Sequence, residues 1–125
     1  MKKFSKTWKI SKNPSKQRKY RTGAPLHIKQ KFVHSHLSKD IRKKYSKRNI
    51  SVRKGDKVKI MYGKFKKHEG KISGIDIKKS IVFVEGVEMT KKDGTKKLLA
   101  LHPSNLMITE LNLDDKLRQK LLERK

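Results

Sequence analysis

The spacing of apolar and polar positions changes along the chain. Between residues 23 and 50 apolar residues recur with a period of about 3.6, whereas from Lys54 onward apolar and polar residues alternate. The first spacing is typical of amphipathic helices and the second of strands with one buried face. The sequence therefore predicts short helices over residues 23 to 50 and a strand-rich region over residues 51 to 109.

Two short helices are expected in the first of these regions. Pro25 suits a first helical position, and residues 26 to 33 could form two turns behind it. Ser35 or Ser38 could cap the second helix, because a serine side chain accepts a hydrogen bond from an unpaired N–H of the first turn. The apolar face of this second helix would carry Leu37, Ile41 and Tyr45.

Short runs of alternating or continuous apolar residues predict strands joined by tight turns. The expected strands are residues 57 to 60, 70 to 77, 80 to 84, 87 to 90, 97 to 101 and 106 to 108. The sequence Lys92-Asp93-Gly94-Thr95 is a specific hairpin signal, since Asp-Gly tolerates the positive φ values that such turns demand. Short strands with frequent turns favour a small closed barrel, which leaves no exposed sheet edge.

The two ends of the chain differ from this middle part. Residues 1 to 22 show no sustained apolar period, so an extended basic arm is expected there. Residues 110 to 125 predict a helix, because the acidic pair Asp114 and Asp115 suits a helix N-terminus. The apolar stripe of that helix would consist of Leu117, Leu121 and Leu122. The expected fold class is mainly β, with short helices before the barrel and one after it.

The amino-acid composition indicates what kind of partner the protein binds. The chain has 125 residues, with 36 Lys and Arg against 11 Asp and Glu, for a formal net charge of +25. The excess is greatest in the first 54 residues, where Asp40 is the single acid. Only 33% of residues are hydrophobic, so the core must be small, and self-repulsion opposes a compact state. We therefore expect a polyanionic partner whose binding orders part of the chain.

Several classes of protein do not fit this sequence. No apolar run approaches the roughly 20 residues of a membrane span, and the basic start lacks the apolar stretch of a secretion signal. A transit peptide is an alternative for that start, although Pro14 and Gly23 would interrupt its helix. The absence of cysteine leaves no disulfide or thiol chemistry, which suits a reducing compartment.

Catalytic chemistry has little support. His34 and His36 could suggest a metal pair, but no third ligand lies near them in the sequence. Asp114 and Asp115 could suggest paired carboxylates, yet neighbours on a helix diverge by about 100°, which favours stabilisation of a helix start instead. No phosphate-loop or hydrolase motif occurs. We expect a protein that is not an enzyme and that has no cofactor, metal or small-molecule substrate.

The most informative stretch is RKGDKVKIMYGKFKKHEGKI, residues 53 to 72. It predicts a strand, a basic loop opened at Gly63, and a return strand that begins near Gly70. Lysines on such a loop can follow a phosphate backbone, and N–H groups at glycines can bond phosphate oxygens. The alternative is a lysine-rich hairpin kept for solubility, but the charge excess favours nucleic-acid binding.

Aromatic residues fall into two groups. Trp8 and Tyr20 lie among basic residues and could stack on splayed bases of an irregular RNA. Tyr45 and Phe83 lie on apolar faces and are expected in the core. The first pair would therefore serve binding and the second pair stability.

Residues 55 to 72 resemble the KOW motif, and the likeness extends well beyond it. The flanking blocks GAPLH, LSKDIRKKY, VRKGD, VEGV, HPSNLMIT and LNLDDK resemble the archaeal and eukaryotic branch of the large-subunit ribosomal protein L twenty-four family. The likeness covers about residues 14 to 125. One position departs from the family, whose loop usually reads lysine, glycine, histidine: Lys67 takes the place of that glycine, and a turn with positive φ there would be strained.

The resemblance implies an SH3-like barrel that binds large-subunit ribosomal RNA beside neighbouring ribosomal proteins. It also implies a cytoplasmic ribosome, a place near the exit of the peptide tunnel, and a role early in subunit assembly. The positions that match the family's RNA-facing loop are Lys64, Lys66, Lys67, His68 and Gly70. Those that match its N-terminal extension are Arg18, Lys19, Arg21, Lys43 and Arg48, and the RNA-binding set also includes Arg53 and Lys54.

Other classes of nucleic-acid protein fit less well or remain open. A transcription-coupled KOW protein of the NusG type would need a polymerase-binding domain, for which 125 residues leave no room. A nucleic-acid-processing enzyme would need clustered acids for metal ions, and the first 39 residues contain none. An assembly chaperone that leaves the finished ribosome remains open, and its stoichiometry in precursors and in assembled subunits would distinguish it.

Overall fold

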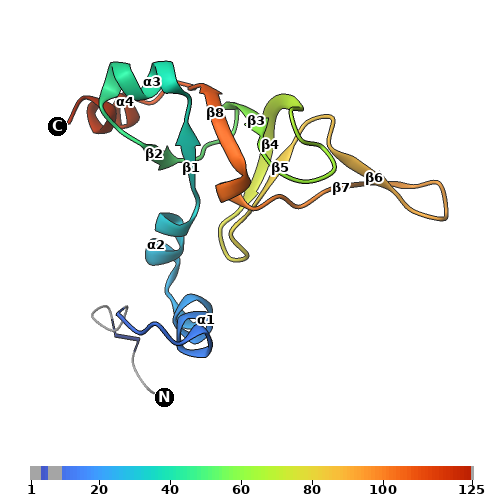
Figure 1. The fold of residues 1–125 in the computed structure, drawn as a ribbon, viewed down its shortest axis with the longest axis horizontal. Coiled ribbons are helices and arrows are strands. Elements are labelled where there is room, and N and C mark those ends of the chain that lie inside the picture. The colour runs from blue at the N-terminus through green and yellow to red at the C-terminus, as the bar shows by residue number, and fades with distance from the viewer. Residues whose placement is uncertain (1–3, 6–9, 125) are drawn as a thin grey trace.

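The computed structural model describes residues 4–5 and 10–124, and eight strands and four α-helices occur within them (Figure 1). The helices are α1 (Pro14–Gly23), α2 (Leu26–Lys29), α3 (Lys39–Tyr45) and α4 (Lys116–Glu123), with the 3-10 turns η1 (Gln30–Phe32) and η2 (Pro103–Asn105). The strands are β1 (His34–Leu37), β2 (Asn49–Ser51), β3 (Lys57–Ile60), β4 (Glu69–Asp76), β5 (Ile81–Val84), β6 (Glu88–Thr90), β7 (Lys96–Leu98) and β8 (Leu106–Glu110). None of these helices is long and apolar enough to cross a bilayer.

Six strands form one sheet in the order β2-β1-β8-β3-β4-β5, in which only the β1–β8 pair is parallel. β6 and β7 form a separate hairpin that projects away from this sheet (Figure 1). Leu101 pairs with Val82 and so ties the chain after β7 back to β5. The mainly β fold class is confirmed. The pairings of the described residues place β2 and β5 at the two ends of the sheet and do not close it.

Strand alternation fills the core as the sequence predicts. β3 buries Val58 and Ile60 and turns its two lysines outward, and β8 buries Leu106 and Ile108. Burial of such side chains is the main favourable contribution to folding, at roughly 1.5 to 3 kcal/mol each.

The two aromatic residues expected in the core have different surroundings. Tyr45 packs against the core from α3. Phe83 is half-buried and pairs with Gly74 of β4, where a Cβ would lie 3.7 Å from the ring. Phe83 is on β5, which is an edge strand of the sheet. Gly74 of β4 has no side chain and leaves room for the Phe83 ring. The edge strand β5 can therefore carry apolar side chains on both of its faces.

The structure corrects the prediction that residues 23 to 50 contain only short helices. Residues His34–Leu37 form strand β1, which pairs with β2 and with β8. Ser38 caps α3 by accepting a hydrogen bond from Ile41 N–H, whereas Ser35 caps no helix. The buried Ser35 hydroxyl instead donates to the Pro103 carbonyl at 2.7 Å. β1 is a strand because it pairs with β8. That partner lies about 70 residues further along the chain, so the local periodicity of residues 34 to 37 does not reveal the pairing.

The prediction of an extended arm is wrong for residues 14 to 22, which belong to helix α1. Asn13 caps this helix by accepting a hydrogen bond from Ser15 N–H at 2.9 Å, and Pro14 occupies its first position. Both features stabilise a helix start locally. No residue of α1 is buried, so the helix carries its basic side chains at the surface.

The prediction that one apolar face of α4 is buried is correct only for Leu122. The side chains of Leu117 and Leu121 are 73% and 53% exposed, while Arg118 and Leu122 are buried. The Arg118 guanidinium donates to the Asp56 carboxylate at 2.6 and 2.7 Å, and this buried pair sets the rotation of the helix. An ion pair between residues so distant in sequence decides which face of α4 packs on the sheet.

Candidate nucleic-acid interface

The basic loop between β3 and β4 is held in one conformation by its own backbone. Lys67 N–H donates to the Ile60 carbonyl at 2.8 Å, and Lys66 N–H donates to the Gly63 carbonyl at 3.0 Å. Phe65 turns inward and packs against the core, so it anchors the loop from within. The three lysines of the loop, Lys64, Lys66 and Lys67, are exposed.

Lys67 adopts a left-handed backbone conformation with φ of 74°. The resemblance to the family suggested strain at this position, where a glycine is usual, and the structure confirms the positive φ. Lysine adopts this conformation less readily than glycine, since its Cβ crowds the backbone. The hydrogen bond from its N–H to Ile60, the last residue of β3, therefore holds a strained residue near the base of the loop.

His68 and Gly70 lie deeper than the three lysines. His68 is half-buried, and its Nε2 lies 3.2 Å from the Glu85 carbonyl oxygen. A Cβ at Gly70 would lie 2.7 Å from the same carbonyl oxygen and 2.9 Å from Val84 Cγ1. The family resemblance placed Gly70 in an RNA-facing loop. Its φ is not positive, and the group that approaches it closely is the backbone of Glu85, the residue that follows β5.

The charges of the loop differ from those of the neighbouring strand. On β3, Lys57 pairs with Glu110 at 3.0 Å, and Lys59 pairs with Glu69 at 3.1 Å. The hydrogen bond to Glu110 is the main cause that raises the pKa of Lys57. No described acid lies within 4.0 Å of the ammonium groups of the loop lysines. The loop thus presents uncompensated positive charge that a polyanion can neutralise.

The N-terminal candidates lie on helix α1. Arg18, Lys19 and Arg21 are exposed, and the Arg21 guanidinium lies 5.8 Å from the centre of the Phe32 ring. Tyr20 packs within the protein, because its ring centre is 4.8 Å from that of Phe4 and 6.4 Å from that of Phe32. Trp8, the other residue expected to stack on bases, lies outside the described residues. The aromatic cluster therefore positions α1.

The remaining candidates lie on α3 and in the segments before and after β2. Lys43 on α3 and Arg48 before β2 are exposed. Arg53 and Lys54 follow β2, and Arg53 forms an ion pair with Asp115 at the start of α4. Figure 1 shows α1 and α3 at opposite ends of the molecule. The predicted site residues thus form an extended footprint rather than one cluster, as suits a ligand that spans the whole protein.

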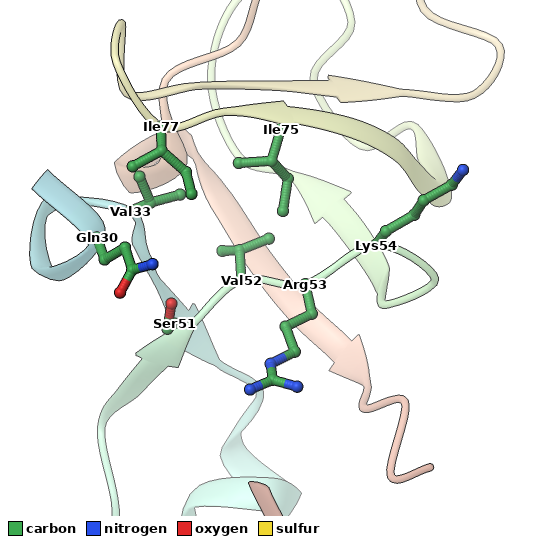
Figure 2. A pocket seen from close by; sticks show the side chains of 8 residues that line it. All are labelled: Gln30, Val33, Ser51, Val52, Arg53, Lys54, Ile75 and Ile77. Carbon is green, nitrogen blue, oxygen red and sulfur yellow. The ribbon is translucent and has the colours of Figure 1, made fainter. Parts of the chain in front are cut away.

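A groove of about 450 Å³ borders Arg53 and Lys54 (Figure 2). Its apolar walls consist of Val33, Val52, Ile75 and Ile77. In Figure 2 the side chains of Arg53 and Lys54 extend away from these apolar groups, and Gln30 lies at the far edge. The walls of the groove therefore offer apolar packing surface, and the Gln30 side chain supplies one amide group at the rim.

The residues considered for metal binding and acid chemistry have structural surroundings. The described part of the chain contains no group of three His, Cys, Asp or Glu side chains that could hold a metal ion. His34 and His36 lie two apart on β1, the first half-buried and the second exposed. Asp115 caps α4, since its carboxylate accepts a hydrogen bond from Leu117 N–H at 2.8 Å, which confirms the helix-start interpretation for this residue.

The cap at Asp115 predicts a pH dependence of stability. The Leu117 N–H, and after it the Arg53 guanidinium, hold the pKa of Asp115 below its ordinary value of 3.8. A carboxyl group whose pKa is lowered in the folded protein stabilises the fold at pH values above its ordinary pKa. This contribution is lost as the pH falls through the lowered pKa of the folded state. We therefore expect Asp115→Ala to destabilise the protein at neutral pH and to differ less from the unsubstituted protein near pH 3 or below.

Urea unfolding midpoints at both pH values measure this effect. Asp114→Ala is the matched control, because Asp114 is exposed and the cap of α4 is its neighbour. A destabilisation by Asp115→Ala that does not change with pH would contradict the electrostatic origin.

The pair formed by Asp56 and Arg118 was not expected from the sequence. Both side chains are buried, and Asp56 also accepts hydrogen bonds from Arg53 N–H and Asn112 N–H, each at 2.9 Å. No local sequence signal distinguishes Arg118 from the other basic residues near the C-terminus. The pair fastens α4 beside the segment that carries Arg53 and Lys54.

Comparisons with known proteins cover nearly the whole chain. Residues 11–125 match the family of ribosomal proteins described as L twenty-six in eukaryotes and L twenty-four in archaea. A protein of Methanothrix thermoacetophila named "Large ribosomal subunit protein uL24" is 47% identical over 115 residues, which are 92% of this chain and 99% of the relative. A protein of the same name from Methanosphaera stadtmanae is 45% identical over 116 residues, 93% of this chain and 99% of the relative.

Proposed function

Because the chain belongs to the uL24 family of large-subunit ribosomal proteins, and is therefore a structural component of the ribosome rather than an enzyme, we propose that it binds large-subunit ribosomal RNA directly. The β3–β4 loop is the proposed centre of the interface. The arginines and lysines of α1, α3 and the segments around β2 extend the contact to the N-terminal helices and to the β2 end of the sheet. Binding neutralises the charge of the chain and displaces counterions from the RNA.

The observation that carries this proposal is the uncompensated charge on a rigid loop. The lysines at 64, 66 and 67 project from a loop that is fixed by hydrogen bonds to β3 and by the inward side chain of Phe65. A fixed loop loses little conformational entropy on binding, so the electrostatic attraction is retained as affinity. Both lysines of β3, Lys57 and Lys59, pair with acids, whereas the loop lysines pair with none of the described acids.

The other predicted site residues divide into contacts and supports. Arg18, Lys19, Arg21, Lys43, Arg48 and Lys54 are exposed and are proposed to contact phosphates. Arg53 would exchange its ion pair with Asp115 for a phosphate. His68 and Gly70 face the backbone of Glu85, directly after β5, so we propose that they set the position of the loop lysines rather than bind RNA themselves.

The placement of the protein within the subunit is part of the same proposal. The family resemblance supports a position near the exit of the peptide tunnel, an early role in assembly, and a cytoplasmic ribosome. The exposed Leu117 and Leu121 on α4 support a neighbouring protein as a second partner, because they form an apolar pair at the surface. Co-sedimentation with large subunits through a high-salt wash, at one copy per finished subunit, is expected. Loss from the finished subunit would favour the assembly-chaperone alternative.

RNA binding should be mainly electrostatic. If about eight Lys and Arg side chains contact phosphates, the logarithm of the binding constant should fall against the logarithm of salt concentration with a slope of roughly −6 to −7. Filter binding of the isolated protein to deproteinised large-subunit ribosomal RNA at several salt concentrations measures this slope. A nearly flat dependence would contradict the proposal.

A further inference from the structure

A second groove, of about 630 Å³, lies where the N-terminal helices meet the turn between β4 and β5 and the segment η2. It is lined by five cationic side chains from separate parts of the chain, namely Arg21, Lys29, Lys31, Lys78 and Lys79. None of the described residues that line it is acidic. Only Arg21 belongs to the interface proposed above, so the groove is a different site from the β3–β4 loop.

Two walls of this groove are fixed by contacts within the protein. On the N-terminal side, the Arg21 guanidinium lies over the Phe32 ring, which in turn contacts Tyr20. On the opposite side, Lys79 N–H donates to Asp76 Oδ1 at 3.1 Å, and Ser80 closes the turn with a left-handed φ of 55°. The two sets of cations are therefore held facing one groove, where they repel each other unless an anion lies between them.

The third wall presents polar groups suited to the same ligand. Ser104 N–H donates to His102 Nδ1 at 3.3 Å, so a neutral His102 ring carries its proton on Nε2. His34 also lines the groove, and its Nδ1 is buried without a hydrogen-bond partner among the described residues. That enclosed atom does not reach the groove, so His102 and Ser104 are the exposed polar residues of this wall.

We propose that this groove binds a phosphodiester segment of the RNA backbone and thereby fastens the N-terminal helices to the sheet. Its volume falls within the range that holds a nucleotide-sized ligand, and several converging cations with ring N–H groups suit an anion with many acceptor oxygens. This inference rests on the proposed RNA binding, but it adds a site and a consequence. The aromatic contacts join α1 to Phe4 and to Phe32 of η1, so the N-terminal elements are held to one another by the protein itself. Their position against the turn between β4 and β5 is what bound RNA stabilises, because the phosphate removes the repulsion between the two walls.

The test compares two double substitutions that remove the same charge. Lys78→Gln with Lys79→Gln changes the groove, and Lys91→Gln with Lys92→Gln changes the exposed turn of the β6–β7 hairpin as the control. Hydrogen exchange over residues 14–34 is followed with deproteinised large-subunit ribosomal RNA, with inorganic phosphate and with poly-glutamate. We expect RNA to slow exchange in the unsubstituted protein and in the control, and the groove variant to lose this protection.

The salt dependence gives a second measurement on the same variants. The groove variant should lose about two phosphate contacts, so the salt slope should become less steep by roughly 1.4 to 1.8. Restoring charge with Lys78→Arg and Lys79→Arg should restore both the slope and the protection, since a phosphate accepts from either cation.

Four results would overturn the inference. Equal behaviour of the groove variant and the hairpin control would show that the groove is not a site. Equal protection by phosphate or poly-glutamate would show that any anion suffices and that the RNA backbone is not its ligand. If the groove variant binds RNA normally while removal of the three loop lysines abolishes binding, only the groove fails. If the unsubstituted protein does not bind RNA, the proposed function fails as well.

Discussion

Gly70→Val should lower the thermal stability and the RNA affinity of the protein together. Even the first side-chain atom at this position would lie 2.7 Å from the Glu85 carbonyl oxygen and 2.9 Å from Val84 Cγ1. Because the first contact is with backbone, β4 must move away from Glu85, the residue that follows β5 and donates its N–H to the Lys71 carbonyl at 2.9 Å. Overpacking of this kind costs about 1 to 3 kcal/mol, which corresponds to a fall in melting temperature of roughly 5 to 15 °C.

The affinity should fall because Gly70 follows the basic loop directly. A displaced β4 moves the loop lysines away from the arrangement that binds RNA. Thermal melting and RNA filter binding on the same samples measure the two effects. Gly23→Val is the matched control, since no atom lies within 4 Å of a Cβ at Gly23.

Lys66→Ala separates charge from packing in the same experiment. It should lower affinity and reduce the salt slope by about one contact while leaving the melting temperature almost unchanged, because Lys66 is exposed. If Gly70→Val melts and binds like the unsubstituted protein, the close packing of β4 on β5 is not required, and the description of the loop is wrong.

Arg118→Met should produce the larger loss of stability. The guanidinium of Arg118 is 3% exposed and donates to both oxygens of the Asp56 carboxylate, to the Asn112 carbonyl at 2.7 Å and to the Ser51 carbonyl at 3.2 Å. Methionine fills similar space but leaves the Asp56 carboxylate buried without its cation. Removal of one partner from such a pair costs about 3 to 5 kcal/mol.

The free energy of unfolding in urea measures this loss. Arg53→Met is the comparison, because it removes the other arginine that pairs with an acid in this region, and the Arg53 side chain is 52% exposed. We expect it to leave stability nearly unchanged while it lowers RNA affinity. Similar unfolding free energies for the two variants would contradict the structural role of the buried pair. Loss of the α4 helix signal in Arg118→Met alone would support it.

Several parts of this protein depend only on neighbouring residues and are predictable from local sequence. Alternation predicts β3 and β4 closely, and the Asp93-Gly94 turn joins β6 to β7 with a φ of 78° at Gly94. The exposure of Lys64 and Lys66 also follows from sequence, since a lysine-rich loop between two strands has nowhere to bury its charge. Strand periodicity, turn chemistry and solvation of lysine all act over a few residues, so one segment is enough to reveal them.

Other parts of the protein take their form from partners that are distant in the chain. β1 is a strand because β8 and β2 pair with it, and α4 turns Arg118 inward because Asp56 lies beneath it, 62 residues away in sequence. The requirement for glycine at position 70 comes from the Glu85 backbone, 15 residues further along, and the basic groove exists only where three separate segments meet. Local patterns carry no information about which distant segments will come together. The burial, pairing and repulsion that arise between such segments are therefore visible only in the folded chain.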